Sequence, residues 1–229
     1  MPIQLPPLSR RAFLRRAWLA GAGLAFAPQL HAAMRRTDAT SFALLADTHI
    51  AADAAKITRN VNMTEHFKTA AQEIVGLKER AAGVFIVGDC ALSSGEPGEY
   101  VQLTALLDSL RGDGLSLNLA LGNHDHRENF WAALESQRAA KRPVVDKQVA
   151  LVKSRHVNWF MLDSLEKTMQ TPGALGEDQL RWLAETLDAN AKTPAVIVVH
   201  HNPGDDNKIN GLKDTGALLE ILRPRSQVK

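Results

Sequence analysis

The stretch FALLADTH, residues 42–49, has a construction that recurs as VFIVGD (84–89), LNLALGNHD (117–125) and AVIVVHHNP (195–203). Each stretch is an apolar run of the kind that forms a strand buried on both faces. Each run ends at Asp, His or Asn, which are ligands for divalent transition ions. Because open α/β sheets bind their ligands beyond the carboxyl ends of the strands, the four ends can converge on one site. We therefore predict a dinuclear metal centre.

The segments between these runs predict an α/β fold with two sheets. Apolar residues three or four positions apart predict helices at about 63–82, in the stretch after residue 98 that ends at Gly112, and at 128–139, 176–187 and 214–222. Residues 148–152 and 157–162 read as two strands joined by a short turn, which pair antiparallel on a second sheet. The predicted fold is a layered α-β-β-α sandwich.

The first 33 residues resemble an export signal. The segment SRRAFLR (residues 9–15) is similar to the twin-arginine motif, and residues 17–27 form an apolar stretch too short to span a bilayer. Cleavage after Ala32 or Ala33 would leave one domain at residues 40–229. The alternative is an ordinary basic tail. The first interpretation predicts export by the twin-arginine machinery to the periplasm or beyond, and no transmembrane segment.

The charge and the cysteine count exclude some classes. Four arginines and no acid lie in the first 33 residues, which leaves 23 of the 27 basic residues against 25 acidic ones, a net charge near −2. That balance argues against a general nucleic-acid-binding surface. Cys90 is the only cysteine, so no disulfide within the chain is possible. We expect it to be buried, the alternative being a thiolate ligand.

The residues at the four ends suit metal binding and proton transfer. Asp47 and His49 alternate in what reads as an extended segment, so both can reach one ion. Asp89 follows a glycine, and its two oxygens can bridge two ions. An Asn carbonyl at residue 123 can ligate metal, and His124 beside Asp125 is suited to proton transfer. Of the last pair, either His200 or His201 can be the ligand.

These motifs (D-x-H, G-D, G-N-H-D and H-H-x-P, in this order) resemble the calcineurin-like metallophosphoesterase superfamily. The resemblance implies a phosphodiesterase or phosphomonoesterase in which two Fe, Mn, Zn or Co ions activate a metal-bound hydroxide against a small phosphate ester. It implies that His124 handles the proton of the leaving group and that Asp125 orients His124. It also implies the metal ligands: Asp47 and His49 for one ion, Asn123 and His200 for the other, and Asp89 as the bridge between the two ions.

The extended motif G-N-H-D-H-R resembles the phosphodiesterase-like branch of the superfamily. Arg127 could contact a phosphate or form a salt bridge that fixes the start of the following helix. A hydrolase of this fold acting on nucleic acid or on lipid-linked diphosphates is a further hypothesis, which a substrate panel would test.

The family's later G-H-x-H motif has no counterpart, since no Gly-His pair occurs in the sequence. We expect the chain to be truncated before this motif and to lack the C-terminal strands of the sandwich. The alternative to an active enzyme is a non-catalytic remnant with an incomplete metal site. Sequencing beyond Lys229 tests this expectation.

Overall fold

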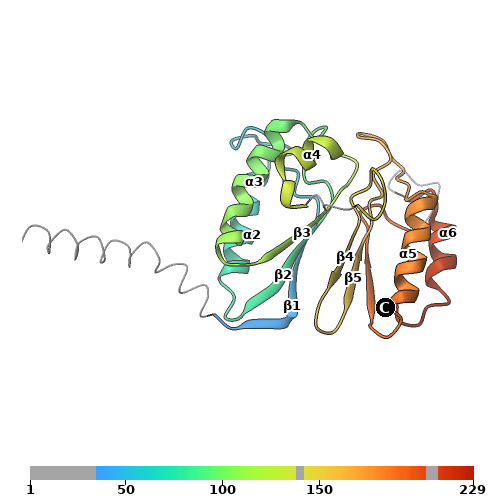
Figure 1. Ribbon diagram of the computed structural model, residues 1–229. Coiled ribbons are helices and arrows are strands. Elements are labelled where there is room, and N and C mark those ends of the chain that lie inside the picture. Colours follow the sequence, from blue (N-terminus) through green and yellow to red (C-terminus); the bar gives the residue numbers. More distant parts are fainter. Residues whose placement is uncertain (1–34, 138–141, 205–210) are drawn as a thin grey trace, which may run out of the picture.

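Two three-stranded sheets face each other, and helices cover their outer faces (Figure 1). The structure is a computed structural model and describes residues 35–137, 142–204 and 211–229. In chain order the elements are β1 (Thr37–Leu45), α2 (Met63–Val75), β2 (Arg80–Val87), α3 (Pro97–Gly112), β3 (Ser116–Ala120), α4 (Arg127–Ala133), the 3₁₀ turn η1 (Glu135–Gln137), β4 (Ala150–Lys153), β5 (Asn158–Met161), α5 (Glu177–Ala189), β6 (Ala195–Val198) and α6 (Thr215–Leu222). The export-signal prediction lies outside the described residues.

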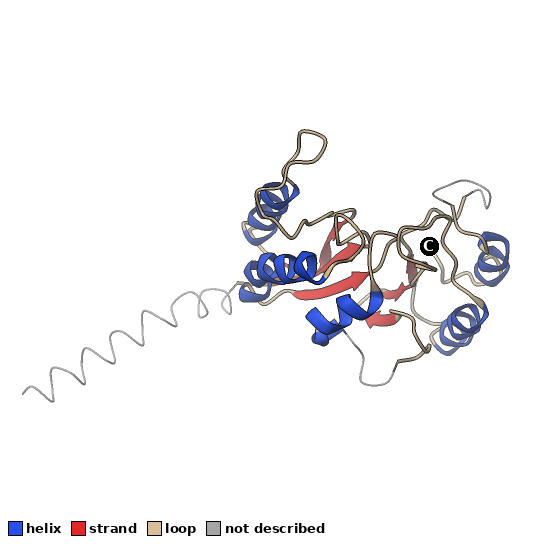
Figure 2. Cartoon of the chain, turned by 90° about the horizontal axis from the view of Figure 1, so that it is seen from above, coloured by secondary structure: helices blue, strands red, loops and turns tan. Residues whose placement is uncertain are grey.

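The first sheet is parallel throughout, in the order β1-β2-β3, so its three ligand-bearing ends share one edge. Strand β2 alternates between two cores, as a buried strand must. Val84 and Ile86 pack under α2 and α3, whereas Phe85 and Val87 point toward the second sheet. Seen from above, the strands lie between the helices (Figure 2). The predicted layered sandwich is confirmed.

The second sheet contains the predicted antiparallel pair and also the fourth ligand-bearing strand. Strand β4 pairs antiparallel with β5, and β5 pairs parallel with β6. Helices α5 and α6 cover its outer face through a cluster that includes Phe160, Leu183 and Leu218. The fourth end therefore reaches the site from a different sheet, and it does so because the two sheets face each other.

Aromatic side chains fill the space between the sheets. The Phe85 ring centroid lies 4.5 Å from that of Trp159, and the Phe42 centroid lies 4.9 Å from it. Met161 and Val198 complete this inner cluster from the second sheet. Apolar surface buried on both sheets fixes how their ligand-bearing edges meet.

Two predicted helices are shorter in the structure. Helix α2 ends at Val75, where the Gly76 N–H closes the last turn on Gln72 O, and Leu77 is 44 % exposed. The chain then extends because Arg80 begins the pairing of β2 with β1. Helix α4 ends at Ala133 and gives way to the short 3₁₀ turn η1. The rest of that predicted helix, residues 138–139, lies outside the described residues.

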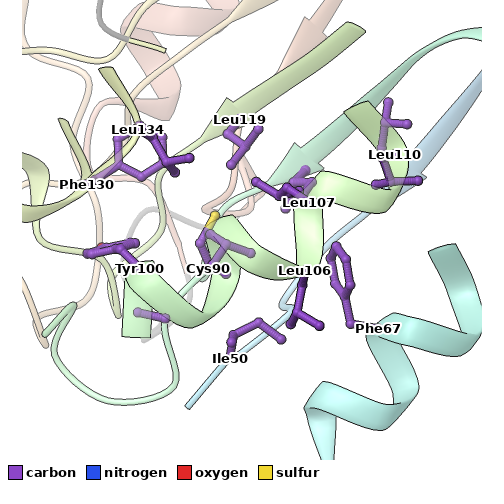
Figure 3. Packing of buried hydrophobic residues seen from close by; sticks show 14 of the residues in the cluster. Ile50, Phe67, Cys90, Tyr100, Leu106, Leu107, Leu110, Leu119, Phe130 and Leu134 are labelled. Carbon is purple, nitrogen blue, oxygen red and sulfur yellow. The ribbon is translucent and has the colours of Figure 1, made fainter. Parts of the chain in front are cut away.

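The core under α2 and α3 contains Cys90, which is fully buried beside Tyr100 and Leu107 (Figure 3). Burial raises the pKa of the Cys90 thiol well above its usual range, and the nearby carboxylates of Asp125 and Asp89 act in the same direction. Such a thiol is not a thiolate ligand. The prediction of a buried cysteine is confirmed. Within the described ranges, no helix is both long enough and apolar enough to cross a bilayer.

Candidate metal centre

The four strand ends converge on one cavity of about 740 Å³. Its floor contains all five predicted ligands and the predicted proton-handling histidine: Asp47, His49, Asp89, Asn123, His124 and His200. The first sheet supplies five of these side chains from the loops after β1, β2 and β3, and the second sheet supplies His200 after β6. Convergence beyond strand ends is what the sequence predicted.

Asp89 lies at the centre of this group and is almost fully buried. Its Oδ2 lies 3.7 Å from His49 Nε2, and its Oδ1 lies 3.4 Å from His200 Nε2. The backbone N–H of His124 also donates to Oδ1, at 2.8 Å. The two oxygens of one carboxylate therefore face two different histidines, as a carboxylate shared by two cations requires.

Three histidines are held in the same way. A backbone carbonyl accepts from Nδ1 of each ring: Ala91 O for His49 at 3.2 Å, Val87 O for His200 at 2.9 Å, and Leu92 O for His124 at 2.8 Å. Since a carbonyl only accepts, Nδ1 carries the proton and Nε2 of the neutral ring keeps its lone pair. Metal-ligating histidines are commonly fixed by this kind of outer hydrogen bond.

The donor atoms form two sets that share Asp89. His49, Asp89 and His124 make one set, and Asp47, Asp89 and His200 make the other, with ligand atoms within 4.8 Å of one another in each. Nitrogen and oxygen atoms with lone pairs lie close together in both sets, and a cation between them would make the arrangement more favourable. The chemistry of this donor set fits divalent cations.

These sets differ from the pairing that the family resemblance implies. Asp47 belongs to the set of His200, although its Oδ1 also lies within 3.9 Å of His49 Nε2. The expected extended geometry of Asp47 and His49 is wrong. Both residues have left-handed backbone conformations, with φ of 52° and 42°. The reason is that β1 ends at Leu45, and the irregular segment after it brings the His49 N–H to Asp89 O at 2.9 Å.

The second histidine of the H-H pair is held by a side chain and not by a backbone carbonyl. Its Nδ1 lies 2.7 Å from the Ser164 hydroxyl, and the His201 backbone N–H donates to the same oxygen at 3.3 Å. The His201 Nε2 is buried and has no partner among the described residues. Burial, with His200 next to it, lowers the pKa of His201 to about 4. These contacts favour His200 as the ligand.

Asp125 does not contact the ring of His124, contrary to the role that the resemblance implies. Its buried carboxylate accepts from the backbone N–H groups of Gly122, Cys90 and Ala91 and from the Tyr100 hydroxyl, at 2.9 to 3.1 Å. Burial raises its pKa to about 6, although the three N–H donors act in the opposite direction. Asp125 thus joins the loops after β2 and β3, and the carbonyls of Leu92 and Ser93 orient the His124 ring instead.

Two glycines permit the close approach of the ligand loops. A Cβ on Gly122 would lie 2.2 Å from Asp89 Oδ1, and one on Gly88 would lie 2.5 Å from His200 Nδ1. Asp89 itself has a φ of 47°. Left-handed, non-glycine residues of this kind are held only where the surrounding structure fixes them, and they concentrate at functional sites.

Arg127 forms the salt bridge that was one of its two predicted roles. Its Nε donates to Asp163 Oδ2 at 2.8 Å, and its second amino group donates to Asp163 Oδ1 at 3.2 Å. His126 caps the start of α4 by accepting from the Asn129 N–H. His126 and Arg127, which extend the G-N-H-D motif, therefore fix the start of helix α4.

Sequence reasoning missed the residues that orient the site from a distance. Ser164 holds the His201 ring through Nδ1, and Tyr100 donates to Asp125. Tyr100 is recognisable only as one more buried position of an amphipathic helix. Ser164 follows a strand of the second sheet, and no local pattern pairs it with a residue 37 positions away.

The fold is that of an α/β protein with a cluster of candidate metal ligands at the carboxyl ends of its strands. The sequence matches the calcineurin-like phosphoesterase family over residues 40–227, and the chain belongs to that family. No curated protein matches it. A similar solved structure is the purple acid phosphatase PPD1 from yellow lupin (Lupinus luteus), with 15 % identity, a TM-score of 0.49 and coverage of 71 % of this chain. The chain spans 30 % of the length of that phosphatase.

Proposed function

We propose that this chain is a phosphoric ester hydrolase that uses two divalent cations held by Asp47, His49, Asp89, Asn123 and His200. Family membership supports the reaction class. The observation that carries the proposal is the position of Asp89, whose two oxygens face His49 Nε2 and His200 Nε2. Bound Fe, Mn, Zn or Co would supply Lewis-acid activation of water and neutralise charge on the phosphoryl oxygens.

His124 is the proposed proton donor to the leaving oxygen. Its Nε2 is the ring nitrogen left for the cavity, because the carbonyls of Leu92 and Ser93 occupy Nδ1. Those carbonyls also hold the ring, so Nε2 can transfer a proton without the ring turning. A positioned general acid of this kind contributes about 10²–10⁴-fold to the rate.

The test is metal binding and hydrolysis by the full chain, with p-nitrophenyl phosphate and bis(p-nitrophenyl) phosphate as substrates. Asp89→Asn keeps the shape of the side chain and removes its charge. Loss of an outer partner alone costs about 10–100-fold in metal affinity, so loss of the shared ligand is expected to cost at least as much and to abolish turnover. Asp108→Asn, an exposed carboxylate on α3, is the matched control.

A second variant separates the two roles open to His124. With His124→Gln, two ions should still bind while kcat falls. A drop to one ion would instead make His124 a ligand of the set with His49 and Asp89. A wild-type chain that binds fewer than two ions and hydrolyses neither ester would support the alternative of a non-catalytic remnant.

The proposed location is the periplasm, reached through the twin-arginine machinery. The motif at residues 9–15 supports this address. Replacing Arg10 and Arg11 together with lysine should leave the protein unexported in a bacterial host, as measured by cell fractionation. Arg16→Lys is the matched control, and continued export of the double variant would overturn the proposed route.

A further inference from the structure

A two-residue hairpin places Arg59 at the rim of the metal-site cavity. The Thr58 N–H donates to Val61 O at 2.9 Å, and the Val61 N–H donates to Thr58 O at 3.0 Å. The two residues between them, Arg59 and Asn60, have φ of 51° and 63°, as a type I′ turn requires. Asn accepts this conformation readily, but Arg does not. An arginine kept in a left-handed conformation beside a site points to a role for its side chain.

The hairpin is anchored to the half of the molecule that supplies most of the ligands. Asn62, which follows it, donates from Nδ2 to Ala54 O at 3.0 Å and caps helix α2 by accepting from the Glu65 N–H at 3.1 Å. The rim therefore has a fixed position relative to α2 and the first sheet. The backbone of Arg59, at the tip of the hairpin, is therefore held in place beside the cavity.

The guanidinium of Arg59 is available for a ligand. Arg59 is exposed, lines the same cavity as Asp89 and His124, and has no carboxylate partner in the ranges that the structure describes. A guanidinium binds two phosphate oxygens at once in a fixed fork geometry. An anion in the cavity would therefore be attracted both by cations bound at Asp89 and by the guanidinium of Arg59.

Part of the lining of the same cavity is apolar. Val61, Met63 and Leu92 line it and are each half-buried. These side chains cannot hydrogen-bond the hydroxyl groups of a sugar or of glycerol, but they bury apolar surface favourably. The lining thus offers charged groups to a phosphate and apolar surface to an alcohol group.

We propose that Arg59 binds the non-bridging oxygens of a phosphate ester whose apolar or aromatic alcohol group lies against Val61, Met63 and Leu92. This inference rests on the proposed function and narrows its substrate class. Arg59 is a substrate-binding residue in this scheme and has no part in holding the cations.

The experiment measures binding of inorganic phosphate to the manganese-loaded full chain by calorimetry, together with kcat and KM for p-nitrophenyl phosphate. Arg59→Gln should weaken phosphate binding and raise KM by about tenfold, the effect of losing a hydrogen bond to a charged group. The kcat and the number of bound manganese ions should stay unchanged. Arg59→Lys should give an intermediate effect, because it keeps the charge and loses the fork.

Two controls define the specificity. Arg155→Gln removes an exposed arginine from the β4–β5 turn, at the opposite edge of the sheets, and should leave every parameter unchanged. Val61→Thr, which keeps the side-chain shape, should raise KM for p-nitrophenyl phosphate while leaving phosphate binding as in the wild type.

The outcomes separate the two proposals. If the wild type hydrolyses the ester and Arg59→Gln keeps the wild-type KM and phosphate affinity, the inference about Arg59 is wrong and the proposed function stands. If the manganese-loaded wild type neither hydrolyses esters nor binds phosphate, both are wrong. Equal KM values for p-nitrophenyl phosphate and glycerol phosphate would overturn the apolar alcohol position.

Discussion

At the scale of single residues, Gly122 is where one methyl group should disturb the site most. A Cβ there would lie 2.2 Å from Asp89 Oδ1 and 2.7 Å from His200 Nε2. Gly122→Ala is therefore expected to displace both ligands. It should lower metal affinity by at least about tenfold, as mutations of residues that position metal ligands do. Calorimetry with manganese measures the effect.

The matched control is Gly216→Ala, in helix α6, where an added Cβ meets nothing within 4 Å. Replacing a helical glycine by alanine usually stabilises by about 0.5–1 kcal/mol. The control should thus raise the midpoint of thermal unfolding and leave metal affinity unchanged. Wild-type metal affinity in Gly122→Ala would show that the strand ends can move apart without loss.

Residue identities and their order were enough to predict which side chains lie together, but not which group holds each side chain in place. His200 and His201 are adjacent and chemically identical in the sequence. Their difference comes from Val87 O on one ring and the Ser164 hydroxyl on the other, contacts that span 113 and 37 residues. The partner of Asp125 was missed for the same reason, since its four donors include backbone groups more than 30 positions away.

At the scale of elements, the pair Arg127–Asp163 should hold α4 to the loop after β5. Asp163 is fully buried and also accepts from the Gln148 and Leu165 backbone N–H groups. These donors remain when Arg127 is removed, so Arg127→Gln is expected to cost about 1.5–3 kcal/mol of unfolding free energy, the contribution of a hydrogen bond to a charged group. Urea unfolding should show a lower midpoint with an unchanged slope.

An exposed pair provides the comparison. Arg181 and Asp178 form an i,i+3 contact on α5 with both side chains mostly in solvent. Arg181→Gln should therefore change the unfolding free energy by less than about 1 kcal/mol. If Arg127→Gln costs no more than this control, the buried bridge contributes to position only.

Most elements could be predicted from hydrophobic spacing, and the errors are at their ends. The periodicity of residues 67, 70, 74, 77 and 81 continues past the real end of α2 because Leu77 and Ala81 fall at helical intervals by coincidence. A strand forms there instead of a helix because Arg80 pairs with Thr37, and local sequence carries no signal of this long-range contact. The assignment of β6 to the second sheet escaped prediction for the same reason.

At the scale of the whole molecule, metal binding should stabilise the fold. A ligand that binds only the folded chain adds about 2.7 kcal/mol when its concentration is 100 times its Kd. Adding manganese is thus expected to raise the thermal midpoint, and a chelator should reverse the shift. Asp89→Asn should show no such shift, whereas a shift of wild-type size in that variant would place the stabilising ion elsewhere.

The ion pair between Arg225, which follows α6, and Asp188 on α5 should make the stability of the fold depend on pH. Arg225 donates to both oxygens of Asp188, at 2.8 and 2.7 Å, and this contact lowers the pKa of that carboxyl below 3.8. A carboxyl with a lowered pKa contributes stability above its unfolded pKa and loses it as the pH falls through the folded value. Asp188→Asn should therefore flatten the loss of stability below about pH 3.8.

Acid titrations followed by circular dichroism would measure this slope. Arg225→Gln removes the other partner and should flatten the slope to the same degree. Asp188 is exposed, so the effect should be small and should shrink further in high salt. A wild-type slope in both variants would mean that the contact does not persist in solution.

The division of the ligands between the two sheets also sets the order in which the site can be completed during synthesis. The first sheet is built from residues 37–120 alone, and every floor residue except His200 precedes residue 126. Chains fold from the N-terminus as they emerge from the ribosome. The Asp89 carboxylate can thus be in place, strained backbone included, before β6 has been made. The centre stays open on one side until His200 arrives, so the final cation should be captured only after β6 and His200 have left the ribosome.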